Sequence, residues 1–122
     1  MKWEPAPASL PKGAEAAVLS GNPTQPGSVT IRLKMPAGYK VPAHNHPTAE
    51  EVTVISGTFH VGMGDKLDEQ KAETLGAGGF VSLPANMNHF AFATSDAVVQ
   101  INTQGPLAIR YVNPADDPSR TQ

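Results

Sequence analysis

The chain has no cysteine among its 122 residues, so a disulfide framework and thiolate chemistry are both excluded. It has no cluster of lysine or arginine, and its formal net charge of −2 disfavours nucleic acid and anionic membranes as partners. No apolar run approaches the roughly 18 residues of a membrane span. The first residues do not form a signal peptide. The compartment stays unknown: cytoplasmic as the sequence stands, periplasmic or secreted where a leader has been removed.

Long helical periods are also missing, and 11 glycines and 12 prolines punctuate short apolar segments instead. In the clearest segment, Val29, Ile31, Leu33 and Met35 alternate with polar residues, as on a strand with one apolar face. Further strands are predicted at residues 14–19, 52–55, 58–63, 80–83, 89–93, 98–102 and 107–112, and a charged loop with room for one helical turn at 65–73. This pattern favours an all-β sandwich or barrel.

A chain of this length builds one hydrophobic core, so a single domain is expected. Residues 1–13 are rich in proline and are predicted to form an extended N-terminal arm. Residues 14–114 form the predicted barrel domain, and residues 115–122 a polar C-terminal tail.

Three of the four histidines and one glutamate lie in two segments marked by glycine and proline. His44 and His46 are one residue apart, so their side chains share one face of an extended strand. Glu50 and Glu51 begin the next strand, where one carboxylate must face away, and Glu51 is the alternative ligand if the register slips. Imidazole and carboxylate together suit a divalent transition metal. Surface histidines with accidental spacing are the other interpretation, and the distant His89 weighs against it.

These two segments resemble the two sequence motifs of the cupin superfamily. The first motif, G-x5-H-x-H-x3-4-E-x6-G, is matched without a gap by Gly38, His44, His46, Glu50 and Gly57. The second motif, G-x5-P-x-G-x2-H-x3-N, is matched by Gly78, Pro84 and His89, whereas Asn86 and Ala93 replace its second glycine and its asparagine. Asparagine tolerates the left-handed backbone conformation, so the turn at position 86 can survive. The resemblance to small single-domain metal-binding cupins covers roughly residues 28–112.

The resemblance implies a cupin double-stranded β-helix, an RmlC-like jelly-roll barrel. It implies that His44, His46, Glu50 and His89 bind one divalent transition metal, with Fe, Mn, Zn, Ni and Co not distinguishable. It further implies a small organic ligand or substrate. Two open metal positions make a dioxygenase-like reaction the first hypothesis, followed by a lyase or an isomerase. The alternative is a non-catalytic cupin module that binds a small ligand or the metal.

Three other polar residues are candidates for lining a pocket. His60 would serve there as a proton carrier, although a hydrogen-bonded or surface histidine is the commoner role. Gln100 and Asn102 share one strand face, opposite to Val99 and Ile101. Their side chains point either into the cavity, as hydrogen-bonding groups, or toward the solvent.

Aromatic residues add two expectations. Phe59, Phe80, Phe90 and Phe92 are predicted to fill the barrel, although the parity of the last two opposes that of His89 and places them outside the metal pocket. A homodimer is expected, in which the arm from Trp3 to Leu10 crosses to its neighbour, as small cupins resembling this chain commonly pair. The arm has apolar side chains but too many prolines for a central strand.

Overall fold

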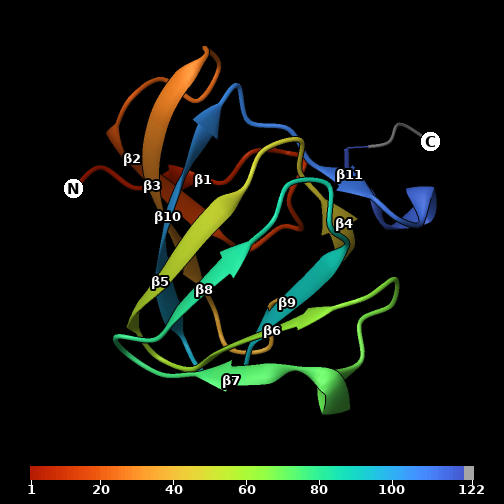
Figure 1. The fold of residues 1–122 in the computed structure, drawn as a ribbon. Coiled ribbons are helices and arrows are strands. Elements are labelled where there is room, and N and C mark those ends of the chain that lie inside the picture. The colour runs from red at the N-terminus through yellow and green to blue at the C-terminus, as the bar shows by residue number, and fades with distance from the viewer. Residues whose placement is uncertain (120–122) are drawn as a thin grey trace.

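The computed structural model describes residues 1–119, and its strands form two antiparallel sheets that enclose the interior (Figure 1). The six-stranded sheet has the order β1-β2-β3-β10-β5-β8, and the five-stranded sheet has the order β11-β4-β9-β6-β7. Within these residues the elements are β1 (Glu4–Pro5), β2 (Glu15–Ser20), β3 (Gly27–Met35), β4 (Lys40–Asn45), β5 (Glu50–Ser56), β6 (Phe59–Met63), η1 (Glu69–Lys71), β7 (Glu73–Leu75), β8 (Phe80–Leu83), β9 (His89–Ala93), β10 (Ala97–Gly105), β11 (Arg110–Tyr111) and η2 (Pro114–Asp116). The predicted all-β jelly roll is confirmed.

The apolar alternation of β3 explains how the interior is built. Val29, Ile31, Leu33 and Met35 are all buried, and β3 pairs with β10 along nine residues, from Met35 opposite Ala97 to Gly27 opposite Gly105. Such a long continuous register is fixed by burial of one face, because a slip of one residue would turn every apolar side chain outward.

Most predicted strands are confirmed within one to three residues of their ends, and η1 is the helical turn expected in the charged loop. The strands β1 and β7 were not predicted, because each has only two or three residues and no apolar alternation. The strand predicted at 107–112 is shorter and contains only Arg110–Tyr111. The last three residues of the predicted C-terminal tail, 120–122, lie outside the described part of the chain.

The N-terminal segment packs on the barrel of its own chain. The amide of Ala6 donates to the carbonyl of Ala14 at 3.0 Å. The hydroxyl of Tyr39 donates to the carbonyl of Pro11 at 2.6 Å, and that of Tyr111 donates to Ser9 at the same distance. These contacts tie the segment to both sheets.

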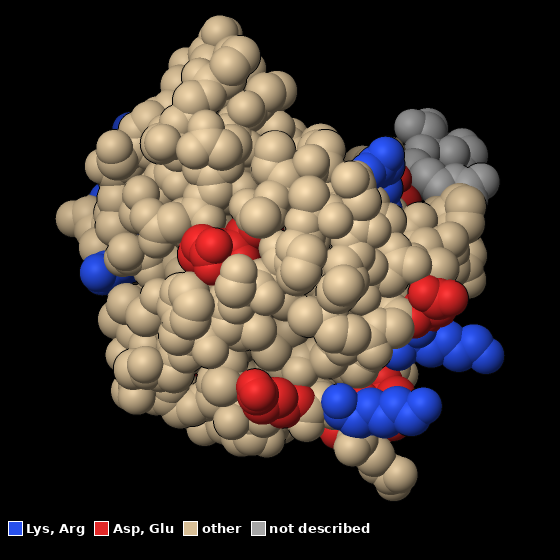
Figure 2. Space-filling model, in the orientation of Figure 1, with Lys and Arg blue, Asp and Glu red and all other residues tan. Residues whose placement is uncertain are grey.

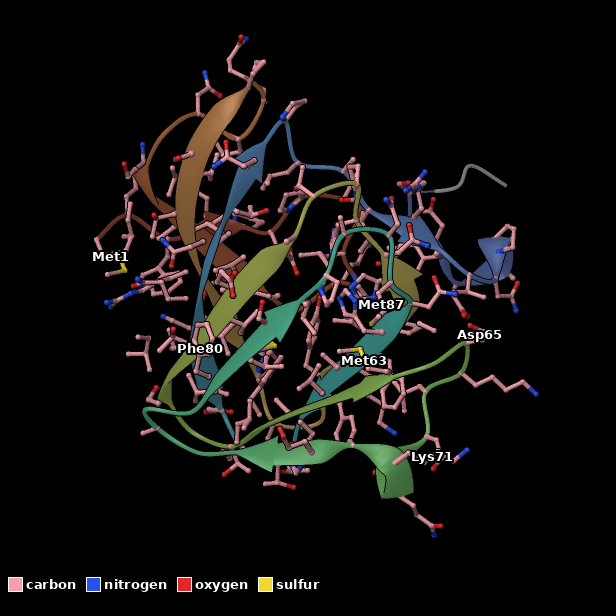
Figure 3. The ribbon with its side chains drawn as sticks, viewed as in Figure 1. Met1, Met63, Asp65, Lys71, Phe80 and Met87 are labelled. Atoms are coloured by element: carbon pink, nitrogen blue, oxygen red, sulfur yellow. The ribbon has the colours of Figure 1, made fainter. Side chains whose placement is uncertain are left out.

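The phenylalanines divide between three environments. Phe59 belongs to the main core inside the barrel. Phe90 and Phe92 form a second cluster with Ala43 outside it. Their parity correctly placed them away from the histidine pocket, but the prediction that they fill the barrel is wrong. Phe80 is 57% exposed, so its predicted place in the core is wrong; it pairs with Thr53 at an outward-facing position of β8 (Figure 3).

The outer surface gives little further indication of a partner. On the face shown in Figure 2, lysine and arginine side chains lie at the margins and do not gather over β5 and β8. No helix within residues 1–119 is long and apolar enough to cross a membrane.

Gly62 gives the second cluster room to form. A methyl group at this position would overlap the ring of Phe90. Gly62→Ala is therefore expected to lower the free energy of unfolding by about 1–3 kcal/mol, through overpacking. Gly76→Ala is the matched control, because a methyl group there meets nothing within 4 Å. Urea unfolding of both variants tests this, and equal stability of the two would contradict the packing described.

Candidate metal centre

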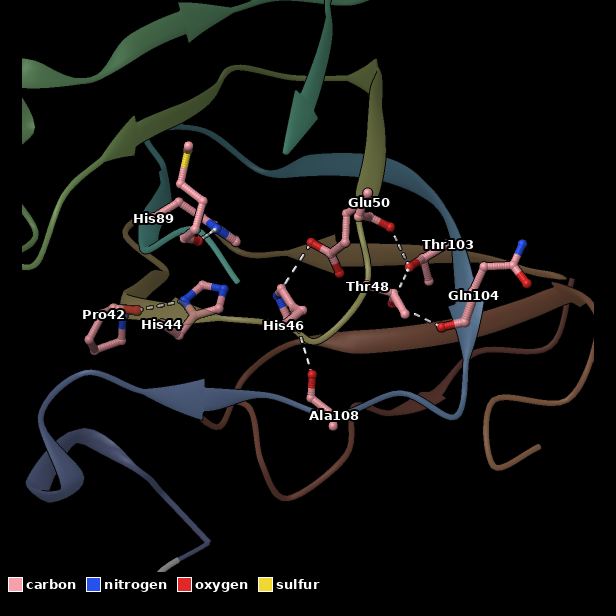
Figure 4. Close-up of polar contacts among 11 residues, drawn as sticks. Pro42, His44, His46, Thr48, Glu50, His89, Thr103, Gln104 and Ala108 are labelled. Carbon is pink, nitrogen blue, oxygen red and sulfur yellow. Dashed lines mark hydrogen bonds and ion pairs between the residues drawn. The ribbon is translucent and has the colours of Figure 1, made fainter. Parts of the chain in front are cut away.

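Three histidines meet at one end of the barrel interior. His44 lies on β4 and is the cross-strand partner of His89 on β9, while His46 directly follows β4 (Figure 4). Both His44 and His89 are buried, with 5% and 2% of their surface exposed. One potential ligand nitrogen from each ring lies within 4.8 Å of the others. This spacing is close to what one ion needs when each nitrogen binds it at about 2.0–2.1 Å.

A β-bulge in β4 turns His44 toward the interior. Val41 pairs with Ala91 and His44 pairs with His89. Between these two pairs β4 has two residues and β9 has one, so β4 contains one extra residue. The extra residue lets Val41 and His44 both line the cavity, while Ala43 between them packs in the outer cluster. The bulge contains Pro42, which has no amide hydrogen to lose from the ladder.

Hydrogen bonds fix the orientation of all three imidazole rings. His44 Nδ1 lies 2.7 Å from the carbonyl oxygen of Pro42, His46 Nδ1 lies 2.8 Å from that of Ala108, and His89 Nδ1 lies 3.1 Å from that of Met87. A carbonyl oxygen only accepts, so each Nδ1 carries the proton and donates it. In the neutral ring, Nε2 then keeps a free lone pair. This is the arrangement that metal-binding histidines typically have.

Glu50 approaches the histidines from the opposite sheet. It lies on β5, and its Oε1 is 3.3 Å from His46 Nε2 (Figure 4). The cluster of mutually close ligand atoms contains the three histidines and not Glu50, which reaches it through His46. A free imidazole nitrogen and a carboxylate oxygen are both acceptors, so they remain this close only with a cation between them, either a proton or a metal ion. The donor set therefore fits a divalent transition metal.

Burial keeps the inner histidines uncharged. Desolvation and, to a smaller extent, the nearby His89 lower the pKa of His44 from 6.5 to about 3, although its bond to the Pro42 carbonyl acts in the opposite direction. Desolvation likewise lowers the pKa of His89 to about 4, although its bond to the Met87 carbonyl acts in the opposite direction. Burial raises the pKa of Glu50, an effect that His46 partly offsets. His44 and His89 are thus neutral at pH 7, the form that binds metal ions.

The histidines open onto an interior cavity of about 320 Å³. Apolar side chains from both sheets surround most of it, and its mouth is formed by residues of the N-terminal segment, the loop before β3 and the segment before β11. Glu50 and Val52 line the cavity and Glu51 does not, so the register of β5 is the one that directs Glu50 inward.

A polar network outside the barrel holds the segments that carry the histidines. Arg110 donates from Nε to Asn45 at 3.0 Å and from Nη2 to Asn86 at 2.8 Å. Asn45 in turn donates to Asn88, and the amide of Asn86 donates to the carbonyl of His46 at 2.7 Å. No local sequence pattern indicates these side-chain partners, because they are far from one another along the chain.

The three candidate pocket residues do not line the cavity, so of the two positions left open for each of them the outer one holds. His60 stacks on Phe92 on the outer side of β6, and its two ring nitrogens lie near hydroxyls of Thr74 and Thr94. Gln100 accepts from Arg32 at 2.9 Å and Asn102 donates to Thr30 at 2.8 Å. Both belong to the outward face of β10, whereas Val99 and Ile101 line the cavity.

The backbone explains the turn positions of both motifs. Gly38, Gly57 and Gly78 have φ values of +87°, +82° and +84°, which a side chain would strain. Asn86 has φ +64°, so asparagine takes the left-handed conformation as the sequence predicted. The missed contributors are the carbonyls of Pro42, Met87 and Ala108. Two of them lie two residues before the histidine they orient, but a carbonyl carries no sequence signal.

The jelly roll and the inward-facing histidines define a protein of the cupin superfamily. The model of the ChrR cupin-like domain matches residues 1–108, so the chain belongs to that family. No curated protein sequence matches the chain.

Several solved structures share the fold. A putative acetylacetone dioxygenase from Methylibium petroleiphilum PM1 is 25% identical, with 98% of this chain and 80% of that chain covered and a TM-score of 0.70. A cupin 2 domain-containing protein from Halorhodospira halophila is 20% identical, with 90% and 85% covered and a TM-score of 0.69. The complex of Rhodobacter sphaeroides SigE with the anti-sigma ChrR is 22% identical, with 84% and 48% covered and a TM-score of 0.63.

The buried histidines make the stability of the metal-free protein depend on pH. The pKa values of His44 and His89 are lowered in the folded protein, so below about pH 6.5 these two residues bind protons in the unfolded chain but not in the native state. The free energy of unfolding should fall as pH drops from 6.5 toward 4, with a slope approaching about 2.7 kcal/mol per pH unit for the two groups. The raised pKa of Glu50 acts oppositely, because its contribution is lost as pH rises above the ordinary glutamate pKa.

Urea unfolding in the presence of a chelator, at several pH values, measures this slope. The double variant His44→Gln/His89→Gln should lose most of it, whereas His60→Gln should keep it. An unchanged slope in the double variant would show that other groups cause the pH dependence.

Proposed function

We propose that the chain is a mononuclear metal-dependent cupin enzyme acting on a small organic molecule, with His44, His46, His89 and Glu50 as the metal ligands. The observation that carries this proposal is the pair of facing acceptors, His46 Nε2 and Glu50 Oε1, 3.3 Å apart. A metal ion held by His46 and Glu50 would satisfy both acceptors, and the free nitrogens of His44 and His89 would be available to it as well. A divalent transition metal is the cofactor that this donor set suits.

The chain's own residues would bind and orient the reactants. Carbonyls of Pro42, Ala108 and Met87 hold the rings, so that little reorganisation accompanies metal binding. The apolar walls of the cavity exclude water and position the rest of the substrate. When bound, the metal would supply Lewis acidity and, if redox-active, electron transfer to dioxygen.

We place dioxygenase-type chemistry first and lyase or isomerase chemistry next. Four protein ligands leave room for two more donors on a six-coordinate ion, enough for a substrate and dioxygen together. Similarity to the putative acetylacetone dioxygenase supports this order. The rival is a non-catalytic module that binds the metal or a small ligand, and similarity to the SigE complex with anti-sigma ChrR favours that class.

A homodimer remains part of the proposal. The segment expected to cross to a neighbour is held on its own barrel by the bonds of Tyr39 and Tyr111 to its carbonyls. Trp3 at its start lies under the ammonium group of Lys34, 4.3 Å from the ring centre. Pairing through an outer sheet face, with both segments kept in place, agrees best with these contacts.

The purified protein should contain about one divalent metal per chain. His46→Ala and His89→Ala each remove a ligand and should lower metal occupancy sharply, whereas His60→Ala, the same change at an outer histidine, should leave it unchanged. Elemental analysis after dialysis against each metal measures this. Full metal occupancy in both His46→Ala and His89→Ala would contradict the assignment of these histidines as ligands.

Glu50→Gln distinguishes a metal from a proton between Glu50 and His46. The glutamine amide can donate to His46 Nε2 without any cation, so the metal-free variant should be at least as stable as the wild type. Its metal affinity should fall by about tenfold or more, because a neutral amide replaces a carboxylate ligand. Unchanged affinity, measured by competition with a chelator, would mean that Glu50 does not bind the ion.

Oxygenase function predicts that the Fe(II) form consumes dioxygen only when a substrate is present. The Zn(II) form should occupy the same ligands without this activity, because zinc has no redox chemistry. An oxygen electrode and a panel of small diols, diketones, keto acids and sugars test this, with His89→Ala as the control.

The other classes give different results in the same panel. A lyase or isomerase turns substrate over with several divalent ions and uses no dioxygen. A binding module does neither, yet a ligand raises its melting temperature by mass action. Turnover that persists in metal-free His89→Ala protein would remove the metal from the mechanism.

A further inference from the structure

The cavity has a marked chemical asymmetry. Its polar side chains gather at the histidine end, where His44, His46, His89 and Glu50 face the interior. The remaining wall is mostly leucine, isoleucine, valine, alanine and methionine. No lysine or arginine is among the described residues that line it. Apart from the histidines, the one ionisable side chain among the lining residues within 1–119 is therefore the carboxylate of Glu50.

Most of the few hydroxyl groups in the cavity wall already donate hydrogen bonds within the chain. Thr103 donates its hydroxyl hydrogen to the carbonyl of Ala49 at 2.7 Å, and Thr24 donates to the side chain of Asn22 at 2.7 Å. Ser9 is the remaining hydroxyl residue, and it lies in the N-terminal segment at the mouth. A ligand rich in hydroxyl groups would find few partners away from the histidines, and each unpaired buried polar group weakens binding.

We infer that the substrate of this site is a small molecule with oxygen donors at one end and an uncharged, apolar remainder. The inference rests on the proposed function for the metal-facing end, and on the cavity wall for the rest. The volume of about 320 Å³ limits the substrate to a small molecule. Sugars, sugar acids and dicarboxylates are disfavoured, because their far ends need polar or cationic partners.

Three catechols with the same metal-binding head test the inference: 4-ethylcatechol, 4-(hydroxymethyl)catechol and 3,4-dihydroxybenzoate. Their binding to the Zn(II) protein is measured by calorimetry after metal content has been determined. The ethyl compound should bind most tightly, the hydroxymethyl compound about tenfold more weakly, and the carboxylate about a hundredfold more weakly or not at all. Equal or tighter binding of the carboxylate, or no binding of the ethyl compound, would overturn the inference.

Methyl NMR locates the ligand within the same protein. The ethyl compound should shift the methyl signals of Val52, Val99 and Ile101, which line the cavity, and leave those of the exposed Val18 and Leu19 unchanged. The opposite pattern would place binding outside the cavity and refute the proposal.

A pair of charge variants tests the cause of the selectivity. Leu107→Lys adds a cation at the cavity mouth, and Leu19→Lys adds the same charge at an exposed position that does not line it. Only Leu107→Lys should strengthen binding of 3,4-dihydroxybenzoate, by up to about fivefold. An equal effect of both variants, or no effect of either, would overturn the explanation from the cavity wall.

These results separate failure of the inference from failure of the proposed function. A protein that holds no metal contradicts the proposed metal centre itself. A protein that holds the metal but prefers the carboxylate keeps the metal centre and rejects only the apolar substrate class.

Discussion

Three hydrogen bonds from imidazole Nδ1 to main-chain carbonyls determine what this interior can bind. They use the nitrogen of His44, His46 and His89 that would otherwise compete for a ligand, and they leave Nε2 of each ring free. The acceptors are peptide carbonyls, so the orientation of the rings depends on the backbone of three separate segments. With Nδ1 of His46 bonded to Ala108, its Nε2 is the nitrogen that lies 3.3 Å from Glu50 Oε1. The low pKa of His44 and His89 has another cause, because burial lowers it and the bonds to the carbonyls oppose that shift.

The site also requires a closed barrel. His44 and His89 belong to the five-stranded sheet, His46 directly follows its strand β4, and Glu50 belongs to the six-stranded sheet, so neither sheet alone could assemble the four groups. The outer network around Arg110 and Asn45 adds a second restraint, because it joins β11 to the segments that carry His46 and His89. An ion bound by both sheets would therefore link two layers that otherwise meet mainly through apolar contacts.

Periodicity predicted most of the strands and an all-β sandwich or barrel, because these depend on local alternation. The jelly roll and the set of four inward-facing residues were implied by the resemblance to the cupin motifs. The short strands β1 and β7 lack an apolar face and were missed. Phe80 shows the limit of hydrophobicity as a guide, since its parity on β8 turns it outward. Gln100 and Asn102 were left open between cavity and solvent, because an alternating strand does not reveal which face is inside. The carbonyl partners of the histidines follow from tertiary contacts and carry no sequence signal.

The bulge in β4 makes the character of the interior depend on backbone geometry as well as on residue type. His44 stands three positions after Val41, so in a regular ladder the two side chains would point to opposite faces. Without the bulge, and with every residue kept, His44 and His46 would point to the outer cluster, and Asn45 would enter the barrel. The same side chains would then form a barrel whose imidazoles face outward. Deleting one residue between Val41 and His44 would instead remove the bulge and leave His44 on the inward face, opposite His89.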